Sequence, residues 1–315
     1  MGCTLIPELI KREYSIRALV YQDSENAQRF PVETVSGSVL NPEAVAGLVQ
    51  GCDTVIHCAA IISIHGDKNG HVRKTNVEGV RNIMEASLKA GVKRVIHISS
   101  IHAYNMTPCD QHLDETREFV PVHGHAYDQS KRDGHCLALS YQDKGMEVIV
   151  MNPTSMVGPP DFKPSLMGQA ICDIYSGRIP SLLPGGFDFV DVRDAANAIA
   201  NAVTQGTPGQ NYLIAGKWHS LKELKSIIEE VGEKKLRIPF IPVWVAKAGL
   251  PFIRSYAYVT RQQPLYSKES ISALVHSNQH ISSDKARKEL GFMTRPLKET
   301  VSDLVQWYRS TGYIN

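Results

Sequence analysis

Short apolar runs alternate with longer amphipathic stretches between residues 16 and 214. Each run is a candidate buried strand, and the amphipathic stretch between two runs is a candidate helix. This alternation is typical of an α/β protein with a doubly wound, parallel sheet. The runs that we interpret as strands are Ile16–Val20, Val32–Ser38, Thr54–Ala60, Val95–Ser100, Val148–Met151 and Asn211–Ile214.

Capping signals mark where several helices begin. Asn41 stands before Pro42, a pair that is typical of the first turn of a helix. Ser220 and Glu223 have the spacing of a capping box. Asp194 is expected to cap a helix that runs from Ala195 to Val203.

The pattern changes after Pro164, where a helix to Tyr175 and a loop at residues 180–186 are expected to leave the sheet. Phe187–Asp194 is expected to be a strand that returns to it. We therefore expect two domains. The Rossmann-like, dinucleotide-binding domain takes residues 1–153 and 187–216, and a smaller, substrate-binding lid takes residues 154–186 and 217–315.

Composition narrows the class of protein. The 315 residues include 34 basic and 32 acidic ones, so the net charge of +2 favours neither nucleic acid nor a membrane as a partner. The six cysteines show no paired spacing, which is typical of a reducing, cytoplasmic compartment. The most apolar stretch, Phe240–Val259, is interrupted by prolines and charges and is interpreted as a helix on the substrate side.

Three residues suggest carbonyl–alcohol redox chemistry. Tyr127 and Lys131 are four apart, so on a helix their side chains share one face. An ammonium group beside a phenol is expected to lower its pKa from about 10 toward the working range. Ser100, at the end of a predicted strand, is placed to hydrogen-bond the reacting oxygen.

The same residues carry a family resemblance. Ser99-Ser100-Ile101-His102-Ala103-Tyr104, followed by Tyr127-Asp128-Gln129-Ser130-Lys131, resembles the Ser…Tyr-x-x-x-Lys signature of extended short-chain dehydrogenases/reductases. This group, the NAD-dependent epimerase/dehydratase family, includes dihydroflavonol reductases and 3β-hydroxysteroid dehydrogenases. The resemblance implies that Tyr127 exchanges a proton with substrate, that Lys131 also holds the nicotinamide ribose, and that Ser100 orients the carbonyl.

The start of the chain departs from that family. Gly2 aligns with the third glycine of the phosphate-binding turn, while the first strand and the first two glycines are missing. Either the protein begins upstream of Met1, which we favour, or the cofactor loop has been lost. We expect the 315-residue chain to bind the cofactor weakly and the restored upstream residues to recover binding.

The resemblance also implies a set of cofactor-binding residues. Asp23 and Arg17 are candidates for the ribose hydroxyls of NAD or the 2′-phosphate of NADP, with NADP slightly favoured. Together with Lys131, the implied cofactor contacts are Gly2, Tyr21, Ser38, Ala59, Ala60, Pro153 and Thr154.

Histidines are dense around the expected site. His102 and His125 are expected to line the substrate pocket, and no metal site is expected because the spacing of the histidines does not match a ligand set. His57, inside a strand, is expected to be a hydrogen-bonded core residue. Asn76 is expected to tie a helix to the sheet.

These inferences predict an NAD(P)-dependent oxidoreductase that interconverts an alcohol and a ketone or aldehyde. The alternatives are a sugar epimerase or dehydratase, which uses the same three residues, and a non-catalytic cofactor sensor or scaffold that has lost its glycine loop. A homodimer is an expectation of the resemblance. A small substrate with a hydrophobic body is favoured by apolar lid residues, namely Met156, Phe162, Leu166, Phe187 and Tyr256.

Overall fold

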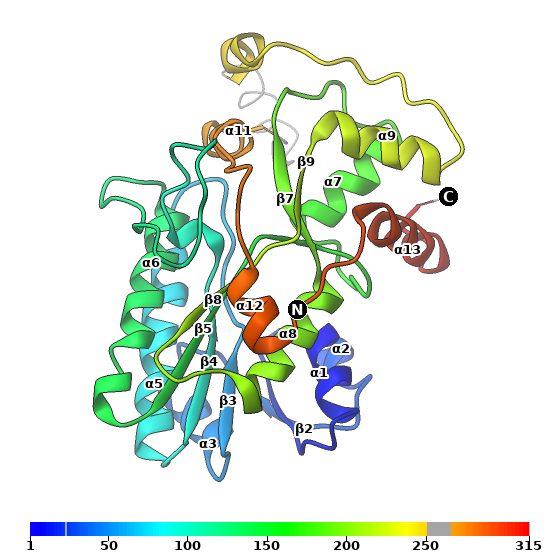
Figure 1. Ribbon diagram of the computed structural model, residues 1–315. Helices are drawn as coiled ribbons and strands as arrows, with labels where there is room; N and C mark the ends of the chain where they lie inside the picture. Colours follow the sequence, from blue (N-terminus) through cyan, green and yellow to red (C-terminus); the bar gives the residue numbers. More distant parts are fainter. Residues whose placement is uncertain (23, 251–265, 315) are drawn as a thin grey trace.

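The computed structural model describes residues 1–22, 24–250 and 266–314, so the predictions for Asp23 and Tyr256 lie outside the described residues. A parallel sheet forms the centre of the molecule, with strand order β3-β4-β5-β8 (Figure 1). Its strands are β3 (Thr54–His57), β4 (Arg94–Ile98), β5 (Glu147–Pro153) and β8 (Asn211–Ile214).

Helices cover both faces of this sheet (Figure 1). Alternate strand residues point to opposite faces, so Val95 and Val148 pack in one core while Ile96 and Ile149 pack in the other. The first core is covered by α3 (Pro42–Val49), α5 (Gly79–Lys89) and α6 (Ala126–Leu139). The second is covered by α1 (Gly2–Ile10), α8 (Val192–Gln205) and α12 (Asp284–Leu290). The predicted doubly wound, Rossmann-like α/β fold is confirmed.

The sheet is interrupted between its first two strands and the rest. β1 (Arg17–Val20) and β2 (Glu33–Ser36) pair in parallel with each other and form a separate two-stranded sheet. Among the described residues, no strand joins β1 to β3. The missing first strand that the sequence analysis describes would lie at this interruption, between β1 and β3.

A second sheet, with order β6-β7-β9, lies in the upper right of Figure 1. In it β7 (Gly186–Asp191) pairs in parallel with β6 (Ser155–Val157) and antiparallel with β9 (Lys217–Ser220). The strand expected to return to the main sheet is therefore part of the second sheet, while β8 does pair with β5. The proposed domain boundaries stay a prediction.

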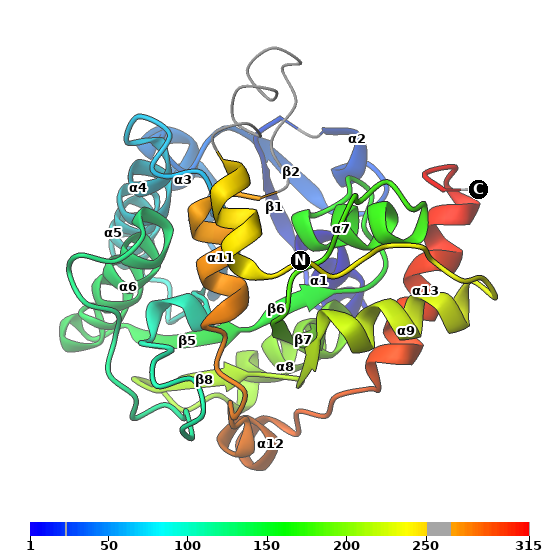
Figure 2. The same cartoon turned by 90° about the horizontal axis from the view of Figure 1, so that it is seen from above.

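Helices pack around the second sheet and share its core (Figure 2). They are α7 (Leu166–Tyr175), α9 (Leu221–Val231), α11 (Lys268–Val275) and α13 (Leu297–Ser310). Shorter pieces are α2 (Ser24–Ala27), α4 (His71–Arg73), a π-helical turn at Lys74–Glu78, and 3₁₀ turns at Ile101–Ala103 and Gln142–Lys144.

The start of α8 corrects one prediction. The backbone N–H of Arg193 donates to the Asp191 carboxylate at 2.8 Å, so Asp191 and not Asp194 caps this helix. Asp194 instead accepts a hydrogen bond from the Arg295 guanidinium at 2.7 Å. Both residues are aspartates, and β7 ends at Asp191, which gives that residue the extended backbone that a cap requires. The caps at Asn41 and Ser220 are confirmed.

Candidate active site

The candidate catalytic residues meet at the carboxyl edge of the parallel sheet. Ser99 and Ser100 follow the last residue of β4, and Ala59 and Ala60 follow β3 by a short step. Tyr127 is in the first turn of α6, which covers the face of the sheet that carries Val95 and Val148. The carboxyl ends of parallel strands lie at the same edge of the sheet. Residues that are distant in the sequence are therefore close together at this edge.

Ser100 and Tyr127 are both buried. Burial raises the pKa of Tyr127 to about 12, and the nearby hydroxyl of Ser100 opposes that rise without cancelling it. Tyr127 therefore carries its proton at neutral pH.

Lys131 lies one turn further along α6 and is also buried. Its Nζ donates to the carbonyl oxygen of Ile98 at 3.0 Å, and burial lowers its pKa to about 8. The expected lowering of the Tyr127 pKa by this ammonium does not prevail, because burial is the largest effect there and raises that pKa. Spacing in a sequence does not show how deeply a phenol is buried.

Asn76 holds the catalytic helix in position. Its amide donates to Ser130 Oγ at 3.0 Å and exchanges hydrogen bonds with the backbone of Ile61, 2.8 Å and 2.9 Å long. Ser130 in turn donates to the carbonyl oxygen of Tyr127 at 2.7 Å. The chain packs so closely here that a Cβ on Gly134 would lie 2.6 Å from the Asn76 carbonyl oxygen. The predicted structural role of Asn76 agrees with these contacts.

We expect Asn76→Ala to lower the free energy of unfolding by about 1 to 3 kcal/mol, because buried backbone and hydroxyl groups lose their partners. Urea unfolding monitored by circular dichroism measures this change. Asn82→Ala is the matched control, since the side-chain amide of Asn82 donates one hydrogen bond, to the carbonyl oxygen of Val39. Equal losses for the two variants would contradict a special role for Asn76.

Two histidine–carboxylate pairs flank Tyr127. His102 Nδ1 lies 2.9 Å from Asp128 Oδ1, and its ring lies edge-on to the Tyr127 ring at 5.5 Å between centroids. His125 Nδ1 lies 3.9 Å from Glu269 Oε1. Asp128 and Glu269 were missed in the sequence analysis. Asp128 could have been found as the neighbour of Tyr127, whereas nothing local marks Glu269, which is remote in the sequence.

Three buried histidines lie under the site, next to Lys131. His57 and His97 are paired across β3 and β4, and their rings stack at 5.3 Å. His135 on α6 contacts Asn152 at 3.1 Å. Burial lowers the pKa of His57 to about 3 and that of His135 to about 4, and it lowers the pKa of His97 well below its usual value. The positive charge of Lys131 lowers all three further.

His57 is a core residue as expected, but its Nε2 has no hydrogen-bond partner within the described parts of the chain. Both ring nitrogens of His97 are likewise unpartnered there. His97 and His135 were missed because the sequence places them in an apolar strand and on a helix with no local signal.

The predicted cofactor contacts fall into two groups. Ala59, Ala60 and Lys131 lie at the carboxyl edge of the main sheet, where the two exposed alanines leave room for a flat ring beside the backbone. Pro153 ends β5 there and is buried, and the hydroxyl of Thr154 already donates to Asp188 at 2.6 Å. These residues fit the nicotinamide end of a dinucleotide.

The other predicted contacts follow the separate pair of strands or the first helix. Tyr21 comes directly after β1 with 65% of its surface exposed, and Ser38 Oγ accepts from the backbone N–H of Leu40 at 3.2 Å. At Gly2, the first residue of α1, an added Cβ would meet no atom within 4 Å. Nearby, the amino group of Met1 lowers the Cys58 pKa, although burial, the larger effect, raises it to about 11. Their part in cofactor binding stays a prediction.

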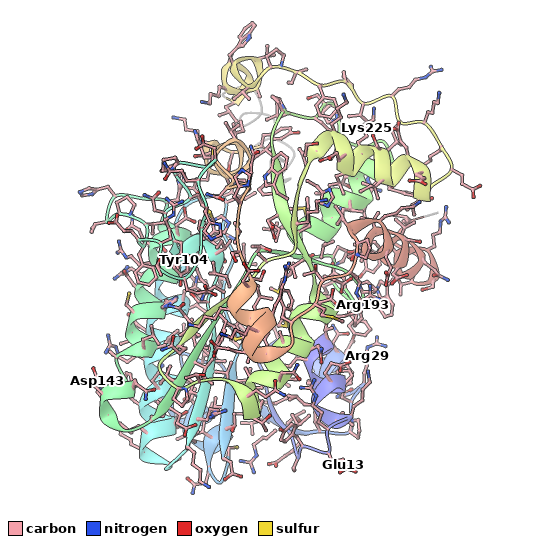
Figure 3. All side chains as sticks on the ribbon, viewed as in Figure 1. Glu13, Arg29, Tyr104, Asp143, Arg193 and Lys225 are labelled. Carbon is pink, nitrogen blue, oxygen red and sulfur yellow. The ribbon has the colours of Figure 1, made fainter. Side chains whose placement is uncertain are left out.

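Tyr104 lies on the side of the molecule that holds α6, whereas Arg193, which is ion-paired with Asp191 and Asp303 at 2.7 Å, lies on the opposite side (Figure 3). Within the ranges that the structure describes, no three His, Cys, Asp or Glu side chains are grouped so that they could hold a metal ion. No helix in those ranges is both long and apolar enough to cross a membrane.

Comparisons with known proteins agree with this architecture. The profile of the NAD dependent epimerase/dehydratase family matches residues 1–215. Sterol demethylase protein B of Methylococcus capsulatus is 29% identical, over 100% of this chain and 97% of its own. A 3-beta-hydroxysteroid dehydrogenase of Mycolicibacterium neoaurum is 25% identical, over 93% of this chain and 84% of its own.

Among solved structures, that of gox2253 superposes with a TM-score of 0.85 and 30% identity, covering 100% of this chain and 96% of that one. Membership in the family supports an NAD(P)-dependent enzyme with oxidoreductase, epimerase or dehydratase activity. On its fold, its sheet order and the match over residues 1–215, this chain belongs to the NAD dependent epimerase/dehydratase family.

Proposed function

We propose that this protein is an NAD(P)-dependent oxidoreductase that interconverts an alcohol and a ketone, with Tyr127 as the acid and base. The observation that carries the proposal is that Ser100 and Tyr127 are buried beside each other, with buried Lys131 one helical turn away. The bound dinucleotide supplies or accepts the hydride.

The proton chemistry follows from the state of Tyr127. Since its pKa is about 12, the hydroxyl is protonated at neutral pH and can donate to a carbonyl oxygen that gains negative charge. Ser100 is placed to donate a second hydrogen bond to the same oxygen. Lys131 remains mostly charged below its pKa of about 8, which favours negative charge on the neighbouring oxygens. This arrangement favours reduction of the carbonyl.

An apolar body on the substrate is supported by two observations. The relatives described above carry the names of a sterol demethylase component and a hydroxysteroid dehydrogenase. One of the predicted pocket residues, Leu166, keeps 51% of its surface exposed. Phe162 and Phe187 do not add to this support, because they pack against Trp307 and against the core of the second sheet respectively.

The test is a cofactor assay on three alcohols, namely a 3β-hydroxysteroid, a small apolar secondary alcohol and UDP-glucose, each with NAD⁺ and with NADP⁺. An oxidoreductase accumulates reduced cofactor, and we expect this with the apolar alcohols. An epimerase returns the hydride to its substrate, so conversion of UDP-glucose without accumulated reduced cofactor would contradict the proposal. Binding of both cofactors with no turnover of any substrate would favour the sensor or scaffold alternative.

Lys131→Met is expected to weaken binding of reduced cofactor by about 10- to 100-fold, because a charge-assisted hydrogen bond is lost. Tyr127→Phe should leave that affinity nearly unchanged. Fluorescence titration with NADH and with NADPH measures both. Lys93→Met is the control, since that side chain is 80% exposed and lies at the amino end of β4, away from the site. Equal affinities for wild type and Lys131→Met would leave Lys131 with an electrostatic role only.

A further inference from the structure

The segment that follows α9, residues 234–250, has an unusual combination of side chains. It runs from α9 across the top of the molecule in Figure 1, in yellow, to a helix at residues 243–250. It contains no acidic residue. Its basic residues are Lys234, Lys235, Arg237 and Lys247.

This segment is held firmly by its backbone. Leu182 donates its N–H to the carbonyl oxygen of Pro239 at 2.9 Å and accepts from the N–H of Ile241 at 3.0 Å. Lys225, labelled on α9 in Figure 3, donates to the carbonyl oxygen of Ile238 at 3.3 Å. Four side chains of the segment are buried in the core of the second sheet, namely Leu236, Ile238, Ala246 and Leu250.

The same segment presents large aromatic side chains to solvent. Phe240 keeps 40% of its surface exposed and Trp244 keeps 72%. In the helix, Trp244, Lys247 and Ala248 are three and four residues apart and all exposed, so they form one outer face. Because the backbone is fixed and the neighbouring apolar residues are buried, this exposure belongs to the fold and marks a contact surface.

We propose that this face docks on an anionic lipid surface. Tryptophan and phenylalanine partition into the boundary between headgroups and acyl chains, and basic residues beside them are attracted to anionic lipids. Three basic residues of the segment, Lys235, Arg237 and Lys247, are exposed, and their positive charge favours an anionic surface. The protein lies on the bilayer in this arrangement, which agrees with the absence of a spanning helix among the described residues.

The position of the face gives the docking a consequence for the site. The helix at residues 243–250 lies next to α11 in both views (Figures 1 and 2). Glu269 of α11 accepts from the N–H of Gly66 at 3.1 Å and faces His125, which directly precedes α6. This consequence rests on the proposed apolar substrate. Docking turns the side of the site near Glu269 toward the lipid in which such a substrate dissolves. The docking itself does not depend on that function.

Overall composition favours no membrane contact, because the net charge of the whole chain is only +2. The structure changes that expectation locally, since Trp244 and Lys247 share the outer face of one helix and Phe240 is exposed in the same segment.

The test is sedimentation of the full chain with vesicles of phosphatidylcholine alone, or of phosphatidylcholine and phosphatidylglycerol in equal parts. We expect binding to the mixed vesicles, weakened by salt. Each of Lys235→Gln, Arg237→Gln and Lys247→Gln should weaken it about fivefold, and Trp244→Ala about tenfold or more. Lys93→Gln and Met293→Ala, which change exposed residues elsewhere, should leave it unchanged.

Tryptophan emission identifies the residue that inserts. The chain has 3 tryptophans, and only Trp244 is among the exposed large apolar residues of the described structure. Its emission should shift to the blue on the mixed vesicles, and Trp244→Phe should abolish the shift while still sedimenting. Vesicle binding by the Gln and Ala variants of this face that equals wild-type binding would overturn the proposal. Absence of vesicle binding by the wild type would also overturn it and would favour an acidic protein as the occupant.

Discussion

Tyr127→Phe is expected to lower turnover by two to four powers of ten, about the contribution of general acid–base catalysis. The substitution removes only the hydroxyl, while the aromatic ring keeps its packing at the start of α6. Ser100 keeps its own hydroxyl, which the proposal places beside the reacting oxygen. Reduced cofactor should therefore bind with nearly unchanged affinity, and the loss should fall on the rate of the chemical step.

Initial rates with the best alcohol from the substrate panel, together with cofactor titration, measure the two quantities. Tyr104→Phe is the matched control, because Tyr104 is fully buried and its hydroxyl has no hydrogen-bond partner in the described structure (Figure 3). That control should keep its activity. Full activity in the Tyr127 variant would remove Tyr127 from the mechanism and with it the proposed chemistry.

The pH dependence of the wild-type rate provides a separate view of the same group. A phenol with a pKa of about 12 remains protonated across the neutral range, so carbonyl reduction should not fall between neutral and mildly alkaline pH on account of Tyr127. Lys131, with its pKa of about 8, is the group whose titration should limit the alkaline side. Its removal should abolish that limb.

Much of the site was predictable because its residues are close in the sequence or lie on regular elements. The apolar run from Val95 to Ile98 could only be a buried strand, so the hydroxyl of Ser100 had to emerge at its end. Tyr127 and Lys131 needed only the period of a helix. Both inferences depend on local geometry, which a sequence contains.

The features that the sequence could not predict depend on which strands pair and on how deeply side chains are buried. β6 and β9 are short and partly polar, and they are strands only because β7 lies between them. Whether Asp191 or Asp194 caps α8 depends on where β7 ends. The pKa of Tyr127 is set mainly by burial, and spacing along the chain does not show that burial.

Acid is expected to unfold the protein well before its carboxylates alone would, because of the buried histidines. In the unfolded chain His57, His97 and His135 have pKa values near 6.5. In the folded protein His57 has a pKa of about 3, His135 of about 4, and His97 well below its usual value. Between pH 6.5 and about 4 the unfolded state thus binds protons that the folded state does not bind.

The sign of the effect follows directly. Stability rises with pH wherever the unfolded state holds more protons, so these histidines destabilise the fold as pH falls below 6.5 and have no such effect above it. Each one costs about 1.4 kcal/mol per pH unit in that window, so the three together cost about 4 kcal/mol per pH unit. A domain with a total stability of about 5 to 15 kcal/mol should then lose most of it near pH 4 to 5.

His97→Leu isolates this contribution, since both ring nitrogens of His97 lack a partner in the described structure and leucine leaves no polar group buried. Urea unfolding at a series of pH values between 7 and 4 gives the number of protons taken up on unfolding. We expect that number to fall by about one in the variant, with stability at pH 7 equal or higher. His123→Leu, at an exposed position, is the control for replacing a histidine with leucine. Equal proton uptake by wild type and His97→Leu would mean that His97 titrates normally in the folded protein, and the histidines beneath Lys131 would not be the cause of acid unfolding.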